Sequence, residues 1–122
     1  LKATPTTLEV LGDGTQQKAY LHVKDLITAM LHIADRNERF AVYNIGPTDE
    51  GVTVRFIAET VRDAFRPNAH ICFGEGNRGW VGDVPKFRYS VQRLLKTGWN
   101  PNLSSSEAVI RAVSEIVAQE ES

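Results

Sequence analysis

The sequence has 122 residues, which is enough for one domain with a modest core. Charged residues make up 24% of it and apolar residues 42%, as in an ordinary globular protein, and the formal net charge of −1 argues against a nucleic-acid partner. No apolar run is long enough to span a bilayer and no signal peptide is recognisable, so we expect a cytoplasmic protein with no membrane partner.

Two further features concern the compartment and the start of the chain. Cys72 is the only cysteine, so no internal disulfide can form, and its apolar neighbours favour a buried, reduced thiol. The sequence begins at Leu1 without a methionine, which suggests that it is a piece of a longer protein. Residues 1–7, which include Pro5, are predicted to be an irregular connection, and residues 8–122 are predicted to form one lobe.

The first quarter of the sequence predicts two strands. Residues 8–11 form a short strand candidate that ends at the Gly-Asp-Gly turn of residues 12–14. Apolar and polar side chains alternate over residues 18–23, which predicts a second strand. One face of this strand could meet a ligand or simply face solvent, and it would carry three polar side chains: Lys18, Tyr20 and His22.

A helix, a strand and a second helix are predicted next. Asp25 is the candidate N-cap of the first helix, in which apolar residues recur at helical spacing up to residue 35. The β-rich residues 40–45 predict a central strand that stops at a Gly-Pro pair. Thr53 then caps the second amphipathic helix, which ends before Pro67.

The last part of the chain predicts a strand, a short helix and a long helix. The strand covers residues 69–73, and the short helix covers residues 89–96 with Gly98 as its stop. Ser104 and Glu107 form an S-x-x-E capping box ahead of the final helix. We therefore expect a mixed α/β fold with a small sheet and about four helices.

A glycine-rich loop, GEGNRGWVGDVPKF at residues 74–87, lies between the last strand and the short helix. Its letters match the dinucleotide-binding pattern G-x-G-x-x-G, but Gly82 and Pro85 exclude the helix that must follow that pattern. Glycines let a loop come close to a ligand. We expect this loop to close over a phosphorylated small molecule with Arg78 as its anion contact, the alternative for Arg78 being a solvated cation.

The sequence offers no catalytic or metal-binding set of its own. His22, His32 and His70 do not have metal-ligand spacing with one another or with Cys72. No G-x-x-x-x-G-K-[ST] loop is present and no serine lies in a nucleophile elbow. From these residues alone, we expect the chain to bind a ligand rather than to catalyse a reaction.

Four runs of residues resemble, in order, motifs of the extended short-chain dehydrogenases, which epimerise or dehydrate nucleotide sugars and include UDP-glucose 4-epimerase-like enzymes. The runs are LEVLGDGTQQKAYLHVKDL at residues 8–26, YNIG at 43–46, the glycine loop with GDVP at 82–85, and LLKTGWNP at 94–101. The likeness covers almost the whole chain from residue 8 onward.

The resemblance implies that residues 8–122 are the C-terminal, substrate-binding lobe of a NAD-dependent isomerase or lyase. In that family a Rossmann half carries the G-x-x-G-x-x-G cofactor loop and the catalytic Tyr-x-x-x-Lys. That half would be a partner outside this chain and would bind NAD, so this fragment alone is expected to bind no cofactor and to be inactive. Its ligand would be a nucleotide sugar, a UDP-sugar first of all.

The resemblance also implies roles for single residues. Two cations, Lys18 and Arg78, would grip the diphosphate. The other positions expected to contact substrate are Asp83 near the ribose, Leu8, Val10 and Gly12 beside the base, and Tyr20 and His22 on the face that carries Lys18.

Two departures from the family pattern affect the predicted contacts with the diphosphate. The family usually has arginine where this chain has Lys18, and lysine keeps the charge but loses the planar, two-pronged contact with phosphate. The loop between Arg78 and Asp83 is also longer than usual, so Lys86 or Arg88 could take the place of Arg78.

A different class of function also fits the sequence. The chain could be a stand-alone protein-interaction module that keeps the architecture of the lobe, and it could form a homodimer. Both hypotheses predict an exposed apolar patch, where either the Rossmann half or a second copy would bind.

Overall fold

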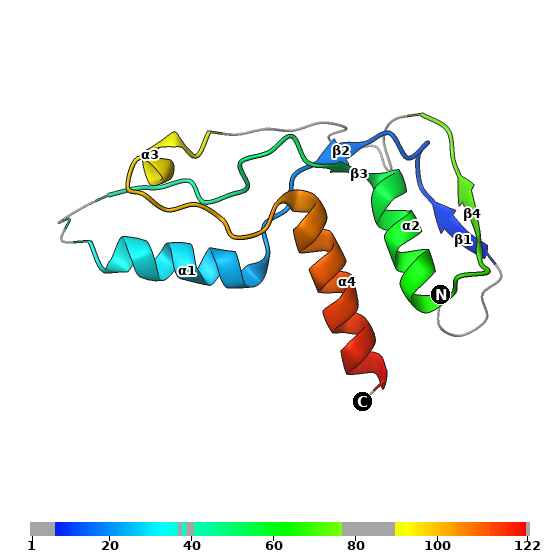
Figure 1. Cartoon of the computed structure of the whole chain (residues 1–122). Helices are drawn as coiled ribbons and strands as arrows, with labels where there is room; N and C mark the ends of the chain where they lie inside the picture. Colours follow the sequence, from blue (N-terminus) through cyan, green and yellow to red (C-terminus); the bar gives the residue numbers. More distant parts are fainter. Residues whose placement is uncertain (1–6, 37, 39–40, 77–89, 122) are drawn as a thin grey trace.

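The computed structural model describes residues 7–36, 38, 41–76 and 90–121 of the chain. Helices and strands both contribute to the fold, so the expected mixed α/β class is confirmed (Figure 1). In chain order the elements are β1 (Thr7–Val10), β2 (Gln17–Lys18), α1 (Val23–Ala34), β3 (Val52–Thr53), α2 (Val54–Phe65), β4 (His70–Phe73), α3 (Gln92–Leu95) and α4 (Ser105–Glu121).

The strands form two small sheets in the described residues. β1 and β4 are parallel, with Thr7 opposite His70 and Val10 opposite Phe73. β2 and β3 are antiparallel, with Lys18 opposite Val52. Helix α2 packs against β1 and β4 on one side and against α4 on the other, while α1 and α3 lie together at the far end of the molecule (Figure 1).

A compact cluster of buried apolar side chains lies at the α1 and α3 end of the chain. Ala29, Leu94 and Trp99 are at most 7% exposed, and Tyr43 and Ile45 pack against them. Because Ala29 has a small side chain, α1 can approach α3 closely. Burial of apolar side chains is the main favourable term in folding, so this cluster holds α1 onto the body of the chain.

The predicted caps of α2 and α4 are confirmed. Thr53 Oγ1 accepts a hydrogen bond from Phe56 N at 3.1 Å. Ser104 N donates to Glu107 Oε1 at 3.0 Å, and Glu107 N donates to Ser104 Oγ at 3.3 Å, which completes the capping box. These contacts satisfy backbone donors that have no partner inside a helix.

The start of α1 differs from the prediction. Its N-cap is His22, whose side chain accepts from Lys24 N, whereas Asp25 lies inside the first turn. Asp25 is 3% exposed, and its carboxylate accepts from Asn102 N and Leu103 N at 3.1 Å each. These two hydrogen bonds join α1 to the turn before α4, and they supply the donors that a buried carboxyl group needs.

Two strand predictions are wrong in their extent. The strand expected over residues 18–23 ends at Lys18, and it cannot extend to residue 23, because α1 begins at Val23 with His22 as its N-cap. Residues 41–45 of the expected central strand form no strand, although Tyr43 and Ile45 are packed on the core. A β-rich segment needs a neighbouring backbone to pair with, and the strands in the described part of the chain pair only with one another.

Cys72 is exposed, contrary to the expected buried thiol. It lies opposite Glu9 in the parallel pair, and exposure alternates with half-burial along both β1 and β4. Side chains of a strand point alternately to its two faces. Leu8 and Ile71 therefore share the covered face, while Cys72 shares the open face with Glu9.

Candidate functional site

The end of β1 lies beside the first residues of the glycine loop. Gly74 N donates to Val10 O at 3.0 Å and to Gly12 O at 2.7 Å. Asp13 N in turn donates to Gly76 O at 2.7 Å. Two segments predicted separately as parts of one binding site are thus brought together at the carboxyl end of the β1–β4 pair.

Residues 77–87 of that loop lie outside the described residues. Arg78 and Asp83 lie outside the described residues, as do residues 1–6 of the expected N-terminal connection. Leu8 and Val10 are half-buried in β1, and Gly12 follows them. The roles of these residues toward a substrate stay predictions.

Arg55 is a cation at this end of the sheet that the sequence motifs do not single out. Its guanidinium carbon lies 4.1 Å from the ring centroid of Phe73, the last residue of β4. Arg55 N also donates to Gly14 O at 3.0 Å, which fixes the start of α2 against the turn after β1. Its position in the first turn after the Thr53 cap was the only sequence signal, and many exposed arginines share it.

Lys18 is held in place through its backbone. It pairs with Val52 in the β2–β3 ladder, and Gln17 Nε2 donates to Glu50 O at 3.1 Å. Gly51 lies directly against the same stretch, since a Cβ atom there would come within 2.2 Å of Lys18 O. The φ angle of Gly51 is 97°, a region that glycine adopts more easily than other residues.

Asp49 and Ser105 join the loop before β3 to the start of α4. Ser105 Oγ donates to Asp49 Oδ1 at 2.5 Å, and Ser105 N donates to Asp49 Oδ2 at 2.7 Å. Tyr20 N donates to Ser105 Oγ at 2.9 Å. Burial raises the pKa of Asp49, but the hydrogen bonds from Ser105 and Gly51 outweigh it, so the pKa lies below its ordinary value.

Tyr20 and His22 line a cavity of about 390 Å³ against α4, and Lys18 and the β1 positions do not line it. Two of the three polar residues that the alternation places on one strand face therefore line this cavity. His22 is 6% exposed, its Nδ1 accepts from Lys24 N at 3.0 Å, and its Nε2 lies 2.6 Å from Glu115 Oε1. Because Nδ1 accepts, the ring proton is on Nε2 and is donated to Glu115.

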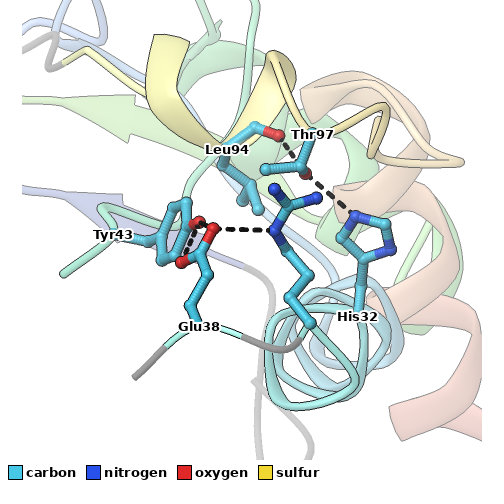
Figure 2. A network of polar contacts seen from close by, with 6 residues as sticks. His32, Glu38, Tyr43, Leu94 and Thr97 are labelled. Carbon is cyan, nitrogen blue, oxygen red and sulfur yellow. Dashed lines mark hydrogen bonds and ion pairs between the residues drawn. The ribbon is translucent and has the colours of Figure 1, made fainter. Parts of the chain in front are cut away.

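A polar network joins the end of α1 to residue 43 and to α3 (Figure 2). Thr97 Oγ1 donates to Leu94 O at 2.6 Å and accepts from His32 Nε2 at 2.9 Å. Glu38 accepts from Tyr43 OH at 2.7 Å and from Arg36 Nε at 3.0 Å, and these contacts lower the pKa of Glu38. Each of these groups forms a hydrogen bond within the chain, so we assign the network a structural role.

Two features of the described residues bear on catalysis. No group of three or more His, Cys, Asp or Glu side chains that could hold a metal ion occurs among them. The family's catalytic Tyr-x-x-x-Lys motif was expected to be absent from this chain, but Tyr20 and Lys24 have its spacing. Tyr20 precedes the N-cap His22, however, while Lys24 is in α1, so the two do not share one helical turn.

Comparison with known proteins agrees with the motifs. The model of the NAD dependent epimerase/dehydratase family matches residues 2–46. The chain is 31% identical over 99 residues to GDP-L-fucose synthase 1 of Arabidopsis thaliana, covering 78% of this chain and 28% of that protein. The chain belongs to the NAD-dependent epimerase/dehydratase family. It is also 27% identical over 109 residues to UDP-glucuronic acid decarboxylase 1 of Arabidopsis thaliana, covering 88% and 24%.

Solved structures of family members share the fold. A UDP-galactose 4-epimerase matches with a TM-score of 0.70 and 30% identity, over 93% of this chain and 35% of that one. A UDP-glucose 4-epimerase from Thermotoga maritima, solved with UDP-glucose, matches with a TM-score of 0.73 and 22% identity, over 93% and 36%. The chain thus spans about a quarter of the length of its curated relatives and about a third of these structures.

No helix in the described residues is long and apolar enough to cross a membrane.

Proposed function

We propose that this chain is the substrate-binding part of a NAD-dependent nucleotide-sugar epimerase or dehydratase. It would hold the nucleoside diphosphate, while a Rossmann half outside the chain binds NAD and performs the redox step. The observation that carries the proposal is the contact of Gly74 with Val10 and Gly12, which joins the strand proposed to contact the base to the glycine loop. Relatives that act on nucleotide sugars support the same substrate class.

The proposed contacts follow from the chemistry of the ligand. A diphosphate is a dianion and needs cations and N–H donors, which Lys18 and Arg78 would supply, with Arg55 close to the same loop. Asp83 would accept from the ribose hydroxyls, and a base would lie along Leu8 to Gly12. Tyr20 and His22 would contact substrate only if the ligand extended toward α4, since both line the cavity on that side.

UDP binding tests the proposal. Isothermal titration calorimetry would compare the wild-type chain with Lys18→Ala and Arg78→Ala, and Lys96→Ala would serve as the control because Lys96 is an exposed lysine at the end of α3. Loss of one diphosphate contact should weaken UDP binding by about 10-fold or more, since a hydrogen bond to a charged group contributes about 1.5–3 kcal/mol. Equal affinity in all four proteins would contradict the proposal.

The exposed face of α1 favours a second polypeptide at this lobe. Four large apolar side chains of α1 are 49–65% exposed: Val23, Ile27, Met30 and Leu31. We call these four residues the α1 apolar face. Contact of these apolar side chains with water is unfavourable. The α1 apolar face would therefore be covered either by the Rossmann half or, if the chain is an interaction module, by a second copy.

Sedimentation of the chain with and without UDP distinguishes these two hypotheses about the α1 apolar face. A substrate-binding lobe should stay monomeric at micromolar concentration or associate without regard to UDP, and should bind UDP as described above. An interaction module should form a defined dimer and show no affinity for UDP.

A further inference from the structure

The backbone of Lys18 is fixed by a set of contacts that centre on one carboxylate and one hydroxyl. We propose that Asp49 and Ser105 are positioning residues for the diphosphate contact at Lys18. The inference rests on the proposed function, because it assigns the two residues a role in the affinity of that site. Neither residue would touch the substrate; both would act through the backbone around Lys18.

The first arm of this arrangement runs from α4 to the residues after Lys18. The Ser105 hydroxyl has one proton, which it donates to Asp49 Oδ1 at 2.5 Å, and it accepts from Tyr20 N at 2.9 Å. Ser105 is 1% exposed, so water does not compete for these hydrogen bonds. Tyr20, two residues beyond Lys18, is thereby tied to the first residue of α4.

The second arm runs from Asp49 to the backbone of Lys18 itself. Asp49 Oδ1 also accepts from Gly51 N at 3.0 Å, which sets the turn that leads into β3. Gly51 lies so close to Lys18 that an added Cβ atom would come within 2.2 Å of Lys18 O. A change in the Asp49 carboxylate would therefore move the turn against which Lys18 rests.

Both arms depend on one helix terminus. Ser105 N donates to Asp49 Oδ2 at 2.7 Å, so the carboxylate is bound to a first-turn N–H group of α4, where the helix dipole favours negative charge. Lys18 and Ser105 are separated by most of the chain, but Asp49 and Ser105 make the position of Lys18 depend on α4. A ligand contact must be held to within a fraction of an ångström to be effective, so such support affects affinity.

A double-mutant cycle with UDP tests the inference. In the full-length protein, Ser105→Ala should weaken UDP binding by a few-fold to about 10-fold, as expected for loss of a buried hydrogen bond. Asp49→Asn should act in the same direction and serves as the second variant if Ser105→Ala folds poorly. In a Lys18→Ala background Ser105→Ala should have almost no further effect, because the contact that it positions is already gone.

Ser104→Ala is the matched control. It removes a serine hydroxyl from the neighbouring position and lowers the melting temperature by removing the α4 cap, but Ser104 contacts neither Asp49 nor Tyr20 in the hydrogen bonds described above. Its affinity for UDP should stay at the wild-type value. If Ser104→Ala and Ser105→Ala weaken binding equally, or if the effects of Lys18→Ala and Ser105→Ala simply add, the positioning role is overturned.

The cycle distinguishes this inference from the proposed function. If Lys18→Ala leaves UDP binding unchanged, the proposed diphosphate contact fails, and the inference fails with it. If Lys18→Ala weakens binding while Ser105→Ala and Asp49→Asn do not, the contact stands and only the positioning role is lost.

Discussion

His22 Nε2 lies 2.6 Å from Glu115 Oε1, so the residue that caps α1 is hydrogen-bonded to the middle of α4 across 93 positions of sequence. The second ring nitrogen of His22 accepts from Lys24 N at 3.0 Å. One imidazole therefore serves as a helix cap and as a link between two helices. Its side chain is almost fully buried, while that of Glu115 is 44% exposed.

Replacing His22 should destabilise the fold. His22→Ala removes the cap of α1 and leaves Lys24 N without its acceptor, so we expect a loss of about 1–3 kcal/mol in the free energy of unfolding. Urea denaturation measures this change in the free energy of unfolding. His70→Ala is the control, since His70 is exposed on β4, and it should change the free energy by less than about 0.5 kcal/mol. Equal effects of the two substitutions would contradict the structural role of His22.

Stability should fall in acid partly through Glu115. The hydrogen bond from His22 is the main cause that lowers the pKa of Glu115 below its ordinary value of 4.5. A carboxylate with a lowered pKa in the folded state binds fewer protons there than in the unfolded chain. Its stabilising effect is therefore present above about pH 4.5 and is lost as the pH falls through the folded-state pKa.

The variant Glu115→Gln isolates this contribution. It keeps an oxygen acceptor for His22 but cannot titrate, so its urea midpoint should decline less than that of the wild type between neutral pH and pH 4. Asp49 and Glu107 also have lowered pKa values, so part of the acid dependence should persist. A wild-type profile in Glu115→Gln would show that the His22 hydrogen bond does not govern the titration.

Two glycines with nearly the same φ angle should respond differently to substitution by alanine. Gly51 and Gly98 have φ angles of 97° and 96°, but an added Cβ atom meets Lys18 O at 2.2 Å only in the case of Gly51. Gly98→Ala should cost about 1–2 kcal/mol for its backbone conformation alone. Gly51→Ala should cost at least about 2 kcal/mol more, because the backbone of Lys18 has to move. Denaturation midpoints compare the pair, and similar values would exclude the close approach.

Charges on the α1 apolar face should alter association without unfolding the chain. Ile27 and Leu31 are 49% and 65% exposed, so Ile27→Lys and Leu31→Lys should change the free energy of unfolding by less than about 0.5 kcal/mol. Binding of the proposed Rossmann half, or self-association, should weaken and can be followed by sedimentation. Ala29→Leu is the opposite control. Ala29 is 0% exposed, so the larger side chain should destabilise the fold by about 1–3 kcal/mol.

Sequence patterns predicted best the features that depend on neighbours in the chain. The caps at Thr53 and at Ser104 with Glu107 were predicted because each joins groups three residues apart. The family was predicted because four motifs occur in order, and the comparisons confirm it. The individual substrate contacts, among them Arg78 and Asp83, are still predictions.

The sequence-based predictions are wrong where a residue's environment is formed by distant parts of the chain. The alternation over residues 18–23 predicts a strand, but His22 accepts a hydrogen bond from Lys24 N as the N-cap of α1 and is hydrogen-bonded to Glu115. Cys72 was expected to be buried, since nothing in its local sequence shows that only one face of the β1–β4 pair is covered.

The sequence alone determined the secondary-structure class, the caps of α2 and α4 and the family, because these depend on local hydrogen bonds and on the order of short motifs. The tertiary structure decided which carboxylates and imidazoles are structural and which apolar side chains face water. Asp25, Asp49 and His22 find their partners 56 to 93 residues away, and spacing along the chain carries no information about such contacts.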